Sequence, residues 1–305
     1  MIILKYYKEI PVIRAIAAIM IVIVHLTANS YHRDNIFAND WLGYLNQISR
    51  LGTPIFAIIS AFLLTASVLN RGFDLKYFVK SRFSKIFIPY LIWTSFYLSY
   101  RYFYLHNKEN FVLHFKPLEE LLNNQAFLFN WIFYFMLGIA LAKYYSEFQE
   151  FIIKYKKVLS VCIGIMFVDL IISIDINNLF TSIHSYNLIY IPLFFIFLTY
   201  IYSYIEKEPI LFNILTLIGN YSMGIYLVHV FVMYTLKRTK LFENIGETYM
   251  FVPTLISILS VSIFIVFLIS KLPYGNYIVP IPKKKTKSKK FKSPISTMDS
   301  NIGRS

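Results

Sequence analysis

Long apolar stretches decide what this chain can fold into. An α-helix rises about 1.5 Å per residue, so about 20 apolar residues cross the roughly 30 Å hydrocarbon core of a bilayer. Hydrophobic residues make up 57% of the 305 positions and charged residues only 15%, a balance outside the usual range of soluble domains. Eight stretches have the required length, at about residues 11–28, 52–69, 86–105, 126–145, 158–175, 188–205, 211–235 and 250–272. The sequence therefore predicts an all-α, polytopic integral membrane helix bundle with about eight transmembrane helices.

The distribution of positive charge predicts how this bundle is oriented. Short cytoplasmic segments retain Lys and Arg, and 21 of these residues fall on the two termini and on alternate loops, against seven on the opposite set of loops. Both termini are therefore expected in the cytoplasm, as an even number of spans requires. Residues 1–272 would form the membrane domain and residues 273–305 a disordered cytoplasmic tail.

The predicted tail carries a lysine-rich run, KKKTKSKKFK, at residues 283–292. A polybasic segment beside the last membrane helix is suited to anionic lipid at the cytoplasmic face. Nucleic acid is the competing partner for a lysine cluster, and the membrane context argues against it. We therefore expect the tail to contact lipid headgroups.

The first span carries two ionisable side chains, Arg14 and His25. Such groups are rare and costly inside a membrane, so their default interpretation is functional. The step of eleven residues from Arg14 to His25 amounts to about three full turns, so both side chains project from one face of the helix, roughly 16 Å apart along its axis. For Arg14 the alternative is a side chain that only snorkels to the nearby boundary. The pair predicts a polar stripe that handles something across the membrane.

Two other interpretations of the chain are disfavoured. The basic start of the first span resembles a secretory signal, but Arg14 and His25 interrupt it and it is longer than an apolar signal core, so we expect an uncleaved helix. The single cysteine, Cys162, lies within an expected span. Neither a disulfide framework nor a thiolate metal site is therefore expected.

A basic cluster precedes the third span. Lys80, Arg82 and Lys85 lie on the predicted cytoplasmic side, and the last two share a helical face because they are three residues apart. Together with Arg14, Arg82 and Lys85 are suited to gripping the phosphates of a cytosolic cofactor, with Arg82 able to bond bidentately. The positive-inside rule alone is the alternative explanation for these charges.

In the seventh span, Ser222, Tyr226 and His229 recur at steps of four and three, which places them on one stripe of the helix. The predicted topology puts His229 in the outer half of the membrane, level with His25. Two histidines at one depth are expected to face each other or a common substrate. A structural role at a helix end is as good an explanation for each histidine taken alone.

Four segments follow one another along the chain: the R-x10-H pair in the first span, GTPIFAIISAFLL at residues 52–64, RFSKIFIPY at 82–90 and GNYSMGIYLVH at 219–229. In this order they resemble the acyltransferase 3 family of membrane acyltransferases. The ordered set covers most of residues 1–270, and GTPIF, NWIFYFMLG and YLVH are similar to the intercellular-adhesion branch, which is linked to poly-N-acetylglucosamine synthesis. The resemblance implies a multi-pass protein of the bacterial cell membrane that moves acyl groups onto extracytoplasmic carbohydrates.

The chain departs from the family pattern in three places. The glycine usual after the serine of the second span, Ser60, is replaced by Ala61, and the second arginine of the R-x-x-R motif is Lys85, which keeps the charge but loses the bidentate fork. The family usually has about ten spans, whereas a short polar stretch at 105–125 joins the third span to the fourth here, and a loss of two helices preserves the orientation. A shortened functional relative and an inactive one are both compatible with this pattern.

The resemblance also implies a reaction. An acetyl or succinyl group arrives on cytosolic acyl-CoA, a co-substrate, without a permanently bound cofactor or metal, and a near-neutral imidazole acts as general base on a sugar hydroxyl. The resemblance assigns donor binding to the cations Arg14, Arg82 and Lys85. It makes His25 and His229 the catalytic residues. It assigns acceptor binding to the hydroxyl groups of Ser60, Ser222 and Tyr226.

Two functions of other classes stay open from the residues alone. A polysaccharide exporter or flippase would use the polar groups inside the membrane to line a path, and internal repeats would favour it, but we find no convincing repeat. A structural subunit that assembles a polysaccharide synthase would tolerate changes at Arg14 and His25. The expected partners are an acyl-CoA donor, a surface glycan acceptor, anionic lipid and, as a further candidate, such a synthase.

Overall fold

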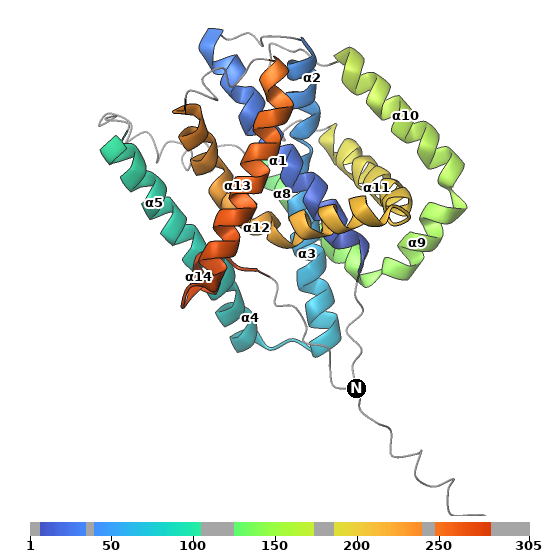
Figure 1. Ribbon diagram of the computed structural model, residues 1–305. Helices are drawn as coiled ribbons and strands as arrows, with labels where there is room; N and C mark the ends of the chain where they lie inside the picture. The colour runs from blue at the N-terminus through green and yellow to red at the C-terminus, as the bar shows by residue number, and fades with distance from the viewer. Residues whose placement is uncertain (1–6, 35–39, 105–124, 174–185, 240–247, 282–305) are drawn as a thin grey trace, which may run out of the picture.

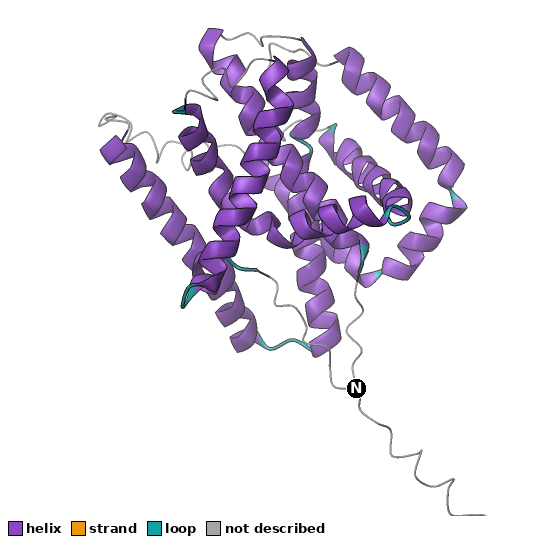
Figure 2. Cartoon of the chain, viewed as in Figure 1, coloured by secondary structure: helices purple, strands orange, loops and turns teal. Residues whose placement is uncertain are grey.

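The computed structural model describes residues 7–34, 40–104, 125–173, 186–239 and 248–281. Within these ranges the chain is helical apart from short turns and contains no strand (Figure 2). The elements are α1 (Glu9–Asp34), α2 (Asp40–Ser49), α3 (Gly52–Arg71), α4 (Leu75–Arg82), the π-helical turn η1 (Phe83–Phe87), α5 (Ile88–Tyr104), α8 (Gln125–Lys143), α9 (Tyr145–Lys154), α10 (Lys156–Ser173), α11 (Asn187–Ile205), α12 (Pro209–Lys237), the 3₁₀ turn η3 (Thr248–Met250), α13 (Phe251–Lys271) and α14 (Gly275–Ile278).

Each of the eight stretches expected to cross the membrane coincides with one helix: α1, α3, α5, α8, α10, α11, α12 and α13. Five helical runs in the described part of the chain are long and apolar enough to span a bilayer, namely Glu9–Ala28, Asp40–Asn70, Asn187–Ile205, Pro209–Lys237 and Phe251–Lys271. The chain is thus an all-helical protein with several membrane-spanning helices. The count of eight spans and the cytoplasmic placement of both termini stay predictions.

The helix α1 lies in the middle of the bundle and packs against α2, α3, α11, α12 and α13 (Figure 1). The backbones of α1 and α12 approach each other directly at Gly219, where a Cβ atom would stand 1.8 Å from the carbonyl oxygen of Pro11. Only glycine permits this approach. The two helices run in the same direction, since this contact lies near both N-terminal ends and a second contact, between His25 and His229, lies further along each.

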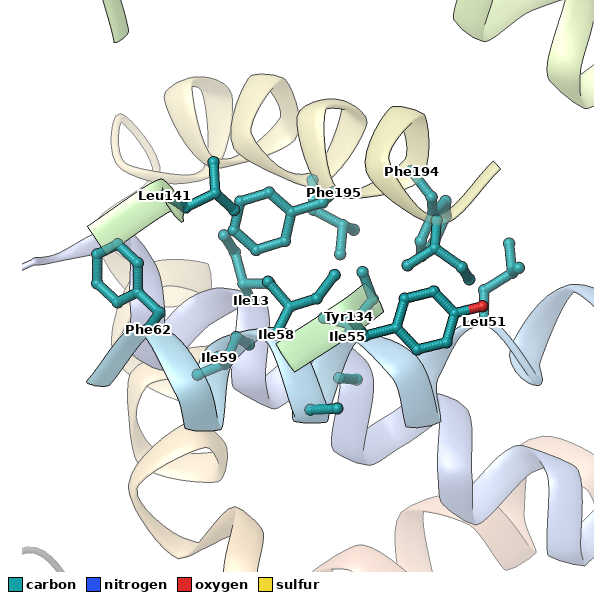
Figure 3. Close-up of a cluster of buried hydrophobic side chains, with 14 of the residues drawn as sticks. Ile13, Leu51, Ile55, Ile58, Ile59, Phe62, Tyr134, Leu141, Phe194 and Phe195 are labelled. Atoms are coloured by element: carbon teal, nitrogen blue, oxygen red, sulfur yellow. The ribbon is translucent and has the colours of Figure 1, made fainter. Parts of the chain in front are cut away.

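One apolar cluster joins α1, α3, α8, α10 and α11. Tyr134 lies at its centre, surrounded by side chains that Figure 3 labels: Ile13, Leu51, Ile55, Ile58, Ile59, Phe62, Leu141, Phe194 and Phe195. Close packing of α3 against α8 depends on Gly138, where a Cβ would be 2.7 Å from the Cβ of Ala61. The small residue that the family pattern places on α3 is therefore supplied by the partner helix, which explains how Ala61 is accommodated.

A pair of helices, α9 and α10, forms an arm at one side of the bundle (Figure 1). The hydroxyl of Tyr190 on α11 donates a hydrogen bond to the Asp169 carboxylate on α10, and the hydroxyl of Tyr200 donates to the backbone oxygen of Ile152 over 3.3 Å. Asp169, a charged residue in an apolar helix, thus serves to fasten the arm to the bundle.

The ordered chain continues beyond residue 272. The short helix α14 follows α13 after a turn in which Tyr274 has a φ of 64°, and Val279 is fully buried. Trp93 on α5 donates a hydrogen bond from Nε1 to the backbone oxygen of Ile278 over 3.1 Å. Residues up to 281 therefore pack on α5, and the lysine-rich run at 283–292 lies outside the described residues.

Candidate active site

The structure brings His25 of α1 and His229 of α12 together. Their ring centroids are 5.0 Å apart and the ring planes are inclined by 53°. The close approach at Gly219 and the parallel course of the two helices bring the rings to one level. The geometry thus agrees with the expectation that the histidines meet at one depth.

The tautomer of His229 follows from its hydrogen bonds. Its Nδ1 lies 3.0 Å from the backbone oxygen of Ile225, and a carbonyl oxygen can only accept, so Nδ1 carries the hydrogen. In the neutral ring Nε2 is then the unprotonated nitrogen. The residue is 2% exposed, and Nε2 has no hydrogen-bond partner among the described residues. A buried basic nitrogen beside a second histidine is an arrangement that can accept or hold a proton.

Both histidines line a cavity of about 500 Å³ between α1, α5 and α12. This volume lies within the range of small-molecule sites. Half of its lining comes from α5, which contributes Tyr90, Trp93, Thr94, Tyr97, Leu98 and Tyr100. The remainder is His25 of α1 and, on α12, Tyr226, Leu227, His229, Val230 and Tyr234.

A buried polar cluster lies on the opposite side of α1, next to His25. Asn46 on α2 donates hydrogen bonds from Nδ2 to the backbone oxygen of Val24 over 3.1 Å and to the hydroxyl of Thr27 over 2.8 Å. Its Oδ1 accepts a bond from Nε of Arg50 over 2.9 Å. These contacts fix the segment of α1 that carries His25. Sequence reasoning missed Asn46, because its partners are backbone and side-chain atoms of a different helix.

The three expected acceptor-binding hydroxyl groups fall in different places. Tyr226 lines the histidine cavity, with its ring centroid 6.2 Å from that of His229. Ser222 is fully buried in α12 and does not line the cavity, and its Oγ has no hydrogen-bond partner among the described residues. Ser60 is exposed on α3, also outside this lining. The structure therefore joins Tyr226 to the histidines but not the two serines.

Two residues of the basic cluster line a second, smaller cavity of about 160 Å³. Arg82 and Lys85 line it together with residues of α3, α4 and their connection, including Ser67, Asp74 and Ser81. The Arg82 guanidinium lies 5.8 Å from the ring centroid of Phe78. Two of the three cations expected to bind phosphate, Arg82 and Lys85, therefore lie at one cavity.

Arg14 is not part of the lining of that second cavity. It is half-buried on α1, within the bundle. Arg14 thus lies apart from the cavity that Arg82 and Lys85 line. The reason is that α1 packs against α12 and α3, whereas Arg82 and Lys85 lie on the separate run of α4 and η1.

One continuous helical run connects the two cavities. Arg82 and Lys85 lie at the junction of α4 and η1, and Tyr90 lies one turn into α5. Five residues of helix rise about 8 Å, so the two linings begin close to each other on the same run. The π-helical turn between them adds a residue to one turn, a feature that recurs at functional sites.

The fold and the cavities define a helical, multi-pass membrane protein with a histidine pair between its helices. The chain belongs to the acyltransferase 3 family, which is described as an acyltransferase domain and matches residues 7–118 and 110–271. No solved structure matches the chain.

Curated relatives of the chain carry a name that concerns export. It is 27% identical over 231 residues to the probable poly-beta-1,6-N-acetyl-D-glucosamine export protein of Staphylococcus aureus strain Mu50, covering 72% of this chain and 58% of that relative. The counterparts in strains MSSA476 and MRSA252 are 26% identical over the same length. The matched part thus spans 58% of the length of these relatives.

Proposed function

We propose that the protein is a membrane acyltransferase that moves an acetyl or succinyl group from cytosolic acyl-CoA to a hydroxyl group of a cell-surface polysaccharide, in the bacterial cell membrane. The observation that carries this proposal is the His25–His229 pair in a cavity of about 500 Å³, with a cation-lined cavity on the same helical run. Membership of an acyltransferase family supports the reaction class.

The proposed chemistry is a direct transfer. His25, which is exposed to the cavity, removes the proton from a sugar hydroxyl as the oxygen attacks the thioester carbonyl carbon. The carbon–sulfur bond breaks, and the thiolate of coenzyme A receives the proton from the His25 imidazolium. His229 Nε2, which in its tautomer can only accept a hydrogen bond, stabilises that imidazolium, and Tyr226 orients the acceptor.

Donor binding is assigned to the cation-lined cavity. Arg82 and Lys85 hold phosphate groups of the donor, with bidentate bonding available to Arg82. The acyl end then extends along η1 and α5 toward Tyr90 and the histidines. Arg14, inside the bundle on the His25 stripe, contacts the part of the donor that lies deeper. Ser60 and Ser222 keep only indirect roles in this scheme.

The test is acyl transfer by the purified protein in lipid nanodiscs. Radiolabelled acetyl-CoA or succinyl-CoA is supplied with an N-acetylglucosamine oligosaccharide, and label in the oligosaccharide is counted. His25→Ala should lower turnover about 100-fold or more, the usual contribution of a general base. Gln149→Ala on α9, distant from both cavities, is the control variant. Transfer by His25→Ala near the wild-type rate would remove the proposed mechanism.

Export is the second candidate function, and the names of the relatives favour it. The cellular readout separates the two. Cells without an exporter lack surface polysaccharide, whereas cells without an acyltransferase carry the polysaccharide in non-acylated form. Unchanged polysaccharide in both amount and acylation would identify an inactive, shortened relative.

Two partner proposals accompany this function. The lysine-rich run at 283–292 would bind anionic lipid at the cytoplasmic face, and a polysaccharide synthase would deliver the acceptor chain. Binding of the full chain to vesicles with and without phosphatidylglycerol, compared with a chain ending at residue 281, tests the first. Co-purification of a synthase from membranes of cells that make the polysaccharide tests the second.

A further inference from the structure

A buried hydrogen-bond network joins α2 to the turn of α1 that carries His25. Asn46 and Thr27 form its centre and are 0% and 1% exposed. From this network we infer that Asn46 is a positioning residue, which holds His25 at the place where it meets His229. The inference rests on the proposed function, in which His25 is the base, and adds a residue that acts through it.

The partners of Asn46 fix the direction in which its amide points. Arg50 Nε can only donate, so the Asn46 atom 2.9 Å from it is the acceptor Oδ1. The Val24 carbonyl oxygen can only accept, so the Asn46 atom 3.1 Å from it is the donor Nδ2. Both ends of the amide require the same orientation, so the side chain has a single arrangement.

The bond to Val24 acts directly on His25. The Val24 carbonyl and the His25 N–H belong to one planar peptide unit, so a bond that holds the carbonyl also orients the backbone of His25. The Thr27 hydroxyl accepts from Asn46 Nδ2 over 2.8 Å and donates to the Ile23 oxygen over 2.7 Å. Asn46 thus binds α1 on both sides of His25.

The helix α2 is itself held in place by apolar contacts. Leu42 is 1% exposed and belongs to an apolar cluster with residues of α1, α12 and α13. Trp41 lies edge-on to Phe251 of α13, with ring centroids 5.3 Å apart. Arg50, at the end of the network, is near enough for its charge to act on His25. A rotation of α1 about its axis would therefore break bonds to a helix that cannot follow it.

The network differs from an apolar contact in what it specifies. Replacement of both partners of a buried hydrogen bond by apolar groups of similar shape leaves stability nearly unchanged. Valine matches Thr27 in shape and leucine is close to Asn46, so an apolar contact would also hold α2 against α1. It would not fix the rotation of α1, since the hydrophobic effect is not directional. Stability and positioning can therefore be separated by experiment.

The test compares Thr27→Val with Asn46→Leu, combined in one chain, with the unaltered protein in lipid nanodiscs. Thermal unfolding should be close to that of the wild type, because both partners are replaced. Turnover should fall about tenfold, since a small misplacement of a reacting group is costly. The Michaelis constant for acyl-CoA should stay within about twofold, because Arg82 and Lys85 are unchanged. Wild-type turnover in this variant would overturn the inference.

Single variants locate the effect within the network. In Asn46→Asp the carboxylate still accepts from Arg50 but cannot donate to Val24, so turnover should again fall about tenfold. Thr27→Ser keeps the hydroxyl and should stay within about twofold of the wild type. Asn70→Ala, the control, removes a similar bond from an asparagine to a backbone oxygen within α3, outside both cavity linings. An equal loss of turnover in Asn70→Ala and Asn46→Asp would contradict a specific role for Asn46.

Cross-linking measures the position of His25 without acyl transfer. Cys162→Ser removes the only cysteine of the chain, and His25→Cys with His229→Cys then places a thiol at each position of the ring pair. A short bifunctional methanethiosulfonate should join the two thiols, about fivefold more slowly once Asn46→Asp is added. Equal rates would overturn the inference. If the unaltered chain transfers no acyl group but the rates differ in this way, the proposed function fails and the positioning role of Asn46 stands.

Discussion

The two cavities differ in volume and in the chemistry of their linings, although one helical run contributes to both. The histidine cavity is large, aromatic and free of formal charge in its lining, whereas the cavity at Arg82 and Lys85 is about a third of its volume and polar. The proposed division into an acceptor site and a donor site rests on this difference. The run from α4 through η1 to α5 contributes to both, so a ligand that enters at the cationic end has a continuous helical surface toward the histidines.

Gly219→Ala should have the largest effect, because it removes the contact on which the histidine pair depends. The new Cβ would stand 1.8 Å from the Pro11 oxygen, so α1 and α12 must separate, at a cost of about 3 kcal/mol. Thermal unfolding in detergent should shift down and acyl transfer should be lost. Gly164→Ala is the control, since nothing lies within 4 Å of a Cβ there. Wild-type stability and activity in Gly219→Ala would contradict the packing described.

His229→Asn should produce the next largest change. Asparagine keeps a donor near the Ile225 oxygen but lacks the Nε2 acceptor, so turnover should fall about 100-fold. The Michaelis constant for the donor should not move, because the donor phosphates bind elsewhere. Steady-state kinetics of the purified variant give both numbers. A rise in that constant without a loss of turnover would place His229 in donor binding and break the division between the cavities.

Arg82→Ala tests the same division from the other end. Removal of the guanidinium should raise the Michaelis constant for acyl-CoA about tenfold and leave turnover at saturation within about twofold. Lys80→Ala, an exposed cation on the same helix outside the cavity, is the control. If the two variants had the same donor kinetics, the positive-inside rule alone would explain the basic cluster.

Tyr97→Phe should have the smallest effect. The ring stays in the wall, but the bonds to Leu227 and Phe231, on either side of His229, are lost. We expect turnover to fall about fivefold with the donor constant unchanged, which corresponds to about 1 kcal/mol. Tyr200→Phe removes a similar tyrosine-to-backbone bond on α11 and should not alter kinetics. Equal kinetics in the two variants would show that Tyr97 has no positioning role.

Most of the fold could be predicted from the sequence, because a helix that crosses a bilayer needs about 20 apolar residues. Apolar stretches such as 188–205 and 250–272 coincide with α11 and α13 almost residue for residue. The helix α2 was not expected, because its sequence DWLGYLNQIS is amphipathic and too short to span a bilayer. The packing of α14 on α5 was also not expected, since it depends on a backbone contact at Ile278 that leaves no sequence pattern.

The site could be predicted from the sequence only where its residues recur along one helix. The spacing of Tyr226 and His229 predicted a shared stripe, and the predicted topology gave the level that brings His229 to His25. The same reasoning did not predict that Arg14 and Ser60 lie outside the linings of both cavities, because helical spacing says nothing about which helices are neighbours. Tyr97 and Trp93 were not predicted to line the site, since aromatic side chains are abundant in membrane helices and do not by themselves indicate a site.

The parallel pairing of α1 with α12 has a consequence for biogenesis. His25 enters the membrane with α1, and its partner His229 follows only after the residues between these two helices have been synthesised. Until then Arg14 and His25 lie in the bundle without α12, and ionisable side chains in an isolated span are costly. The histidine pair is therefore absent until α12 is in place, and the acyl transfer that we propose depends on that later step.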